Sequence, residues 1–432
     1  MELLSLVLVF IVVLFVPLLL GVPVAYAIGI SALVIMLLPI GPSLTLRPVA
    51  IRMLRSSTSF ILLAIPFYLF AGRLLSASSA TEAIFEFSKA VTGPIQGGLA
   101  HVNVIASIIF SGMSGSAVAD AAGLGKIEYE MMKNSGYDDG FIVSVIGSSA
   151  VIGPIIPPSI LLIVYGVLAG QSIGRLFLAG IVPGLLMGVS IMVLIVYLSK
   201  RRNYPSGEDW NVARIGRTAL YAGPAIFTII LIIGGILTGT FTATEAGAIA
   251  VIWSIAIGML FYRDLSLAGI WEAARESLHD VTAIMLILAT TEIYSFTVLR
   301  TGIPGLLVDA LVGLNLGPTG ILMIIAASMV ILGIGLYPLT ILILIVPILA
   351  PEMHTLGLDP VHAGIVIMLA LMLGLLTPPV GPVLFVLSKV TDTSVELISR
   401  SMLPFYIPLI ITILIIILFP ELTMYIPNHY FG

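Results

Sequence analysis

The groups in this sequence best placed to do chemistry are backbone carbonyls freed where an apolar helix is broken. Residues 147–166 are apolar enough to cross a membrane, but the dipeptides Gly153-Pro154 and Pro157-Pro158 lie in their middle. Proline removes a backbone donor and clashes with the preceding turn, so a helix over this stretch must break. Within a membrane, broken backbone is tolerated only where protein or a water-filled cavity surrounds it. There the freed carbonyl oxygens can bind an ion, and no carboxylate is required.

The same interruption occurs a second time, around Thr377-Pro378-Pro379, and 378 − 157 = 221 residues separate the two copies. Matched residues at this single offset are Gly112 and Gly333, Gly136 and Gly357, Asp138 and Asp359, Gly153 and Gly374, Pro183 and Pro404, and Ala27-Ile28 and Ala248-Ile249. A matched pair of glycine- and proline-interrupted apolar segments is the strongest sequence indication of a transporter binding site. The chain is therefore expected to be duplicated, with one such site in each half.

Each break is expected to face a re-entrant hairpin whose tip adds further oxygen ligands. Residues 97–133 read as two arms around a small-residue tip at 111–116, and neither arm reaches the ~20 apolar residues that a span needs. Residues 318–354 repeat this pattern. We expect two pseudo-symmetric sodium sites. Their candidate ligands are Ser111, Ser114 and the carbonyls of Gly153, Ile156 and Pro158, and, in the second half, Gly333, Gly335 or Leu336, Gly374, Thr377 and Pro379. The alternative is that these small residues only allow close helix packing.

Four further residues are candidates for binding an anionic substrate: Arg300, Ser116, Asp120 and Thr297. Asp120 is an ionisable residue in an apolar segment, which is a functional candidate, although it could simply cap a hairpin helix. The guanidinium of Arg300 matches a carboxylate, although it could instead anchor a span at the membrane surface.

An enzymatic alternative exists, because Gly112-Met113-Ser114-Gly115 matches a serine nucleophile motif of intramembrane proteases. That chemistry requires a base within hydrogen-bond reach of the serine. His101 lies several turns away on the same hairpin arm, and the other four histidines fall in connectors or near segment ends. We therefore expect a protein that is not an enzyme.

The composition sets the class of protein. Hydrophobic residues make up 59% and charged residues 9% of the 432 residues, and the mean hydropathy is +1.20. Soluble domains carry about 25% charged residues. The chain is thus expected to be an all-α polytopic membrane protein, with the lipid bilayer around it and no nucleic acid as a partner. Because cysteine is absent, disulfides, thiolate metal sites and cysteine nucleophiles are excluded.

The elements that must position the site residues follow the same order twice. The first repeat covers residues 1–199 and the second 218–426, with a polar connector at 200–217. The expected parts are arm helices at 44–57 and 264–280, hairpins at 97–133 and 318–354, broken helices at 140–170 and 361–390, and about five spanning helices per half, one of them a separate span at 281–298. Because five is odd, the second half should be inverted. Scaffold and transport domains should each combine both repeats, with hinges at 76–80 and 93–98.

The motifs place this sequence close to a known family. Residues 111–120 (Ser-Gly-Met-Ser-Gly-Ser-Ala-Val-Ala-Asp), 153–159 and 176–184, in this order and spacing, resemble the large membrane subunit of tripartite ATP-independent periplasmic (TRAP) transporters. The resemblance covers essentially the whole chain. It implies import of an organic acid anion driven by two or more Na⁺ per cycle, through an elevator movement, in the bacterial inner membrane.

The same resemblance implies two partners, a small four-span membrane (Q) subunit and a soluble periplasmic substrate-binding protein. Since the chain starts at its first span, we expect the small subunit to be a separate chain. Residues 292–300 depart from the commoner dicarboxylate pattern, so sialic acid or another sugar acid suits the sequence as well as a C4-dicarboxylate. Other hypotheses are a stand-alone cation-coupled carboxylate carrier that needs no binding protein, and a non-transporting scaffold.

Overall fold

The structure, a computed structural model, describes residues 2–37, 47–114, 116–123, 125–207 and 209–431. This part of the chain is helical, and its only β-pairing is an isolated bridge between Gln96 and Ser206. Six of the described helices are long and apolar enough to cross a membrane, or seven if one bent pair is counted as a span. They are α11 (Ile173–Arg202), α12 (Val212–Leu237), α13 with its π-helical extension (Ala243–Tyr262), α14 (Leu267–Thr301), α16 (Gly317–Gly335) and α20 (Val395–Leu418). The all-helical polytopic class is confirmed.

Shorter helices complete the fold. They are α1 (Glu2–Leu19), α2 (Val24–Leu37), α3 (Arg47–Ser57), α4 (Ala64–Ser76), α5 (Ala80–Thr92), α6 (Gly98–Ser114), α7 (Ala117–Gly123), α8 (Gly125–Asn134), α9 (Asp139–Ala150), α10 (Ile160–Ala169), α15 (Ile303–Val312), α17 (Pro338–Leu349), α18 (Pro360–Leu375), α19 (Pro382–Thr391) and α21 (Glu421–Phe431). Both expected broken helices are present, as α9 with α10 and as α18 with α19.

The order of elements repeats along the chain. Adding 221 to Ile160, the first residue of α10, gives 381, one residue before the start of α19 at Pro382. The same offset relates α1 to α12, α2 to α13, α6 to α16, α7 to α17, α9 to α18 and α11 to α20. The packing of the helices also relates the two repeats, because α10 of the first repeat packs against α17 of the second, while α19 of the second packs against α7 of the first. Each broken helix thus ends against the hairpin of the other repeat.

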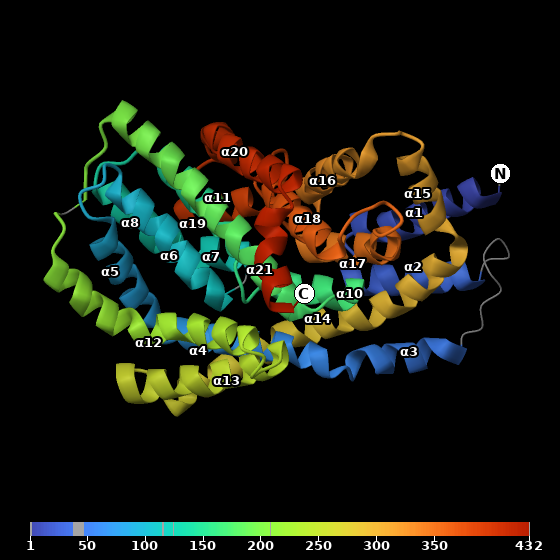
Figure 1. Cartoon of the computed structure of the whole chain (residues 1–432), viewed down its shortest axis with the longest axis horizontal. Coiled ribbons are helices and arrows are strands. Elements are labelled where there is room, and N and C mark those ends of the chain that lie inside the picture. The colour runs from blue at the N-terminus through green and yellow to red at the C-terminus, as the bar shows by residue number, and fades with distance from the viewer. Residues whose placement is uncertain (1, 38–46, 115, 124, 208, 432) are drawn as a thin grey trace.

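One pair of expected elements is a single helix. The sequence predicts an arm at 264–280 and a separate span at 281–298, but α14 runs unbroken through 35 residues. Its only glycine, Gly269, lies in the first turn and it contains no proline, so nothing interrupts the backbone hydrogen bonds. In the first half, by contrast, the arm α3 and the span α4 are separate helices. Helix α14 packs along α2, α3 and α4, and Figure 1 shows it beside α3 and α4 near one edge of the molecule.

The expected hinge at residues 76–80 coincides with a real helix break, because the helical segments Phe60–Ser76 and Ala80–Thr92 meet at an angle of 71°. The second expected hinge, at 93–98, is held by the connector between the repeats. Here Gly97 N–H donates to the carbonyl of Pro205 at 3.0 Å, and the indole Nε1 of Trp210 donates to the carbonyl of Val91 at 3.2 Å. The connector therefore lies against the base of the first hairpin.

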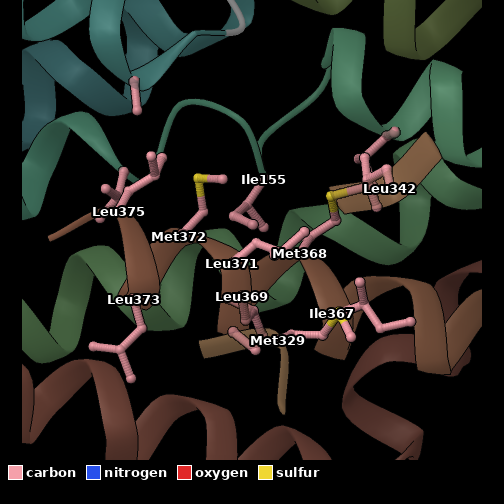
Figure 2. Packing of buried hydrophobic residues seen from close by; sticks show 14 of the residues in the cluster. Ile155, Met329, Leu342, Ile367, Met368, Leu369, Leu371, Met372, Leu373 and Leu375 are labelled. Atoms are coloured by element: carbon pink, nitrogen blue, oxygen red, sulfur yellow. The ribbon is translucent and has the colours of Figure 1, made fainter. Parts of the chain in front are cut away.

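The core of the molecule is centred on α18, in which every residue is buried. Its side chains belong to one large apolar cluster that also includes residues of the first break. Figure 2 shows Ile155 from that break in the same cluster as Met368 and Met372 of α18. Helix α18 thereby connects the two halves of the duplicated fold.

Candidate functional site

The tips of the two hairpins line one cavity of about 520 Å³. Ser116 contributes from the first tip, and Tyr337 and Pro338 contribute from the second. The first break adds Pro154, and α18 adds Met372 and Leu375 near its end. The opposite wall comes from α4 and α14, through Leu69, Gly72, Arg73, Ser76, Asp280, Ala283 and Ile284. The cavity therefore lies between the duplicated hairpin-and-break elements on one side and the packed helices α4 and α14 on the other.

The second break lies directly against the second hairpin tip. Gly381 N–H donates to the carbonyl of Ile334 at 3.0 Å. The helices α16 and α18 approach closely at Gly333 and Gly374, because a Cβ atom built on Gly374 would lie 2.7 Å from the Cα of Gly333. Only glycine fits at this contact, which brings two of the expected sodium ligands together.

The hydroxyl of Thr377 is already oriented by the helix end. It donates to the carbonyl of Leu373 at 2.8 Å, so its oxygen retains lone pairs that can accept a cation. Nearby, Tyr406 donates to the carbonyl of Leu376 at 2.6 Å. Leu336 ends the tip with extended backbone after α16, and Pro379 lies exposed within the second break. The candidate ligands of the second sodium site thus follow one another from the second hairpin tip to the second break.

The first break is buried throughout, from Val151 to Ser159. Ser159 donates its hydroxyl to the carbonyl of Pro154 at 2.5 Å and caps α10 by accepting from Leu162 N–H at 3.3 Å. Gly153, Ile156 and Pro158 all lie in this segment. The backbones of Ser111 and Ser114 form the last turn of α6, but their side chains lie outside the described part of the structure.

The four substrate candidates are separated in space. Ser116 lines the cavity between the tips. Asp120 is one turn further along the hairpin, where it is buried and does not line that cavity. Thr297 is fully buried in α14 and donates to the carbonyl of Ile293 at 2.8 Å. Arg300 lines a different cavity.

That second cavity, of about 820 Å³, lies further along α14. Arg52 pairs with Glu292 at 3.2 Å, and its Cζ lies 3.9 Å from the ring centroid of Phe296. The Cζ of Arg300 lies 5.4 Å from the same ring. Residues 280 and 296 of one helix are ~24 Å apart at ~1.5 Å per residue. The two cavities therefore border consecutive stretches of α14, the first at residues 280–284 and the second at residues 288–300.

An ion cluster in the cavity wall was missed from the sequence. Arg73 of α4 pairs with Glu276 and Asp280 of α14, and both Arg73 and Asp280 line the cavity. Arg73 is not among the site residues that the sequence predicts. The signal that could have found it is the spacing of the two acidic residues, because side chains four apart lie on one face of a helix. Together, the carboxylates of Glu276 and Asp280 form a binding site for the guanidinium of Arg73.

Comparison with protein families gives one match over most of the chain. The model of the family described as "Tripartite ATP-independent periplasmic transporter, DctM component" matches residues 11–422.

Individual relatives agree. The chain is 36% identical over 412 residues to the sialic acid TRAP transporter large permease protein SiaM of Vibrio cholerae, covering 95% of this chain and 96% of the relative. It is 33% identical over 389 residues to the C4-dicarboxylate TRAP transporter large permease protein DctM of Pseudomonas aeruginosa, covering 89% and 90%. Among solved structures, the YdaH transporter of Alcanivorax borkumensis is similar with a TM-score of 0.65 at 12% identity, covering 97% of this chain and 98% of that one. At this identity the likeness concerns the fold alone.

Proposed function

This chain belongs to the DctM component family of tripartite ATP-independent periplasmic transporters, and from that premise we propose that it imports an organic acid anion across the bacterial inner membrane, driven by sodium ions. The observation that carries the proposal is the cavity between the two hairpin tips. It is bordered by both repeats and is large enough for a small organic anion. A site formed by broken helices at a repeat interface is the typical arrangement of secondary transporters.

Sodium is the coupling ion that suits the chemistry of the tips. Both breaks offer carbonyl oxygens, and Thr377 adds a hydroxyl whose proton is already donated to Leu373. No group of three or more histidine or acidic residues suited to a metal ion occurs among the described residues. Hard monovalent cations bind carbonyl and hydroxyl oxygens at helix ends. We assign one sodium ion to each tip-and-break pair.

The substrate is proposed to be a sialic acid, another sugar acid or a C4-dicarboxylate. The two relatives named for sialic acid and C4-dicarboxylates are 36% and 33% identical to this chain. Within the cavity, Arg73 is held by Glu276 and Asp280 rather than left open for a carboxylate. A polyhydroxylated acid could exploit the Asp280 carboxylate and the Ser116 hydroxyl as hydrogen-bond partners. This geometry favours the sugar acid.

The mechanism is proposed to be an elevator movement. The hairpin of each repeat packs against the broken helix of the other repeat, α7 against α19 and α17 against α10. These elements can therefore move as one body. On the other side, α14 packs with α2, α3 and α4, and α4 with α13, as a continuous wall. The cavity lies at the boundary of these two groups. Sliding along α14 would carry the tips from Asp280 toward the cavity at Phe296.

The proposed partners follow from the family. A small four-span membrane subunit would cover exposed apolar surface on the wall helices, and a soluble periplasmic binding protein would deliver the anion. The alternative is a carrier that works without a binding protein.

The test is uptake into proteoliposomes that contain this chain with its small subunit. We expect accumulation of radiolabelled sialic acid or C4-dicarboxylate only with an inward sodium gradient and binding protein. Uptake that is equally fast without the binding protein would support the stand-alone carrier instead. Failure with every acid under a sodium gradient would overturn the proposal.

A further inference from the structure

Two carboxyl groups are buried on neighbouring helices of the first hairpin. Asp120 lies on α7 and Glu128 on α8, and each residue is only 3% exposed. The two interact electrostatically, and Glu128 also interacts with the side chain of Asn103 on α6. Figure 1 shows these three helices together, and α8 packs against both α6 and α7. None of these three residues lines the cavity between the tips.

The described polar groups around Glu128 supply no positive charge to compensate its carboxylate. Asn103 accepts from the hydroxyl of Ser149 at 2.5 Å through its Oδ1, so its amide nitrogen is the atom available toward Glu128. Neither that nitrogen nor Oε1 of Glu128 has a hydrogen-bond partner within the described residues. Glu128 also belongs to none of the ion pairs that the described residues form. The buried amide of Asn103 is thus neutral company for Glu128, whose charge no cation compensates among the described residues.

The other titratable groups on the packed helices do not act on this site. Helix α8 packs against α6, α7, α9 and α19. On these helices, His101 is buried and does not contribute to the electrostatics of Glu128, Asp139 is paired with Lys133 at the far end of α8, and Lys389 is exposed. Among the described residues, Asp120 is the charged group that acts on Glu128.

Burying an unpaired carboxylate costs several kcal/mol, and a buried group avoids the cost by taking up a proton. When two carboxyls share one site, a single proton is held by the pair rather than by either residue. With two carboxyls and no third acidic or histidine ligand in the described chain, the site is also too poor in ligands for a divalent metal. We propose that Asp120 and Glu128 together bind one proton at neutral pH, so that the first hairpin carries a proton in addition to the ions at its tip.

The bound proton can be detected without transport. Infrared spectra of the purified chain in lipid should contain the C=O stretch of a protonated carboxyl at pH 7. Glu128→Gln should remove that band, whereas Glu130→Gln, an exposed residue on the same helix, should leave it. An unchanged band in Glu128→Gln would overturn the proposal, and so would a band that disappears on adding sodium, because the site would then bind the metal ion.

A second variant keeps the test decisive if Glu128→Gln does not fold. Asp120→Asn removes the like charge, so the proton on Glu128 should dissociate at lower pH than in the wild type. A titration of the band that is identical in Asp120→Asn and wild type would show that the two residues do not share a proton.

The role of this proton in transport rests on the proposed function, but the infrared result does not. If the hairpin moves only with the pair protonated, wild-type uptake should fall as the pH rises and deprotonates the pair. Glu128→Gln should lose this pH dependence, and Glu130→Gln should keep it. A falling profile retained in Glu128→Gln would overturn the coupling role. Absence of uptake in the wild type would instead count against the proposed function and leave the proton site standing.

Discussion

Thr377 is the residue on which the proposed second sodium site depends most, because it is the only side-chain ligand proposed there. We expect Thr377→Val to raise the sodium concentration for half-maximal uptake by about tenfold, which corresponds to about 1.4 kcal/mol of binding free energy. The isosteric methyl group removes the oxygen and leaves the helix intact.

Thr391→Val is the matched control, because Thr391 makes the same hydrogen bond to the carbonyl four residues earlier, at 2.7 Å, but lies at the far end of α19. An equal sodium dependence in both variants and the wild type would contradict the assignment of Thr377.

Gly374 is required by the close approach of two helices. In Gly374→Ala the new Cβ would lie 2.7 Å from the Cα of Gly333 and from the carbonyl oxygen of Val330. Backbone atoms cannot yield as a flexible side chain does, so we expect a loss of ~1–3 kcal/mol of stability and a lower thermal midpoint in detergent. Gly335→Ala is the control, since open space surrounds Gly335. Equal midpoints for the two variants would contradict the packing argument.

At the scale of elements, α14 is one unbroken helix that lines both cavities. Thr282 is exposed near Asp280, and Thr282→Pro should break the helix at a cost of ~3 kcal/mol or more. Because the wall then no longer spans both cavities as one body, we expect the maximal uptake rate to fall strongly. Thr282→Ala preserves the helix and should transport normally. Full uptake by the proline variant would show that an unbroken α14 is unnecessary.

The first hairpin should move together with its own broken helix. A Cβ atom built on Gly125 of α8 would lie 3.3 Å from a methyl group of Ile146 on α9, so side chains at these two positions are in direct contact, as a disulfide requires. In this cysteine-free chain, we expect Gly125→Cys/Ile146→Cys to form a disulfide that leaves uptake nearly unchanged. Complete loss of uptake on oxidation, with recovery on reduction, would place α8 and α9 in separate moving bodies.

The sequence predicted elements best where glycine and proline punctuate apolar runs. The breaks at Pro157 and Pro378 and the bend at residues 76–80 follow from local backbone chemistry. By contrast, α14 has no such punctuation between its arm and its span, and polar residues there suggested a boundary that the helix simply crosses. The short helices α15 and α21 lack the length of a span and were not expected. They are stabilised by tertiary packing, as α21 is by α11, which a one-dimensional pattern does not contain.

For the whole molecule, the duplication was predictable but the contents of the cavity wall were not. One offset of 221 residues relates the helices of the two halves, and it was readable from Gly153 and Gly374 alone with their proline pairs. The ion cluster of Arg73, Glu276 and Asp280 does not follow that symmetry. At the offset of 221 residues, Arg73 corresponds to Tyr294, which is a buried aromatic residue. An asymmetric contact between distant segments depends on how the repeats fit together, and no repeat pattern encodes it.

Movement of the hairpin tips against the wall is tested most directly by a crosslink across the cavity. Ser76 of α4 and Ser116 of the first tip both line it. We would join Ser76→Cys and Ser116→Cys with cleavable bifunctional thiol reagents of increasing length, and label each single variant with a monofunctional reagent of equal bulk. We expect the shortest reagent that joins the pair to abolish sodium-driven uptake, with recovery on cleavage, while the singly labelled variants retain most of their uptake. Complete crosslinking with uptake at the normal rate would contradict an elevator movement of the tips along α14.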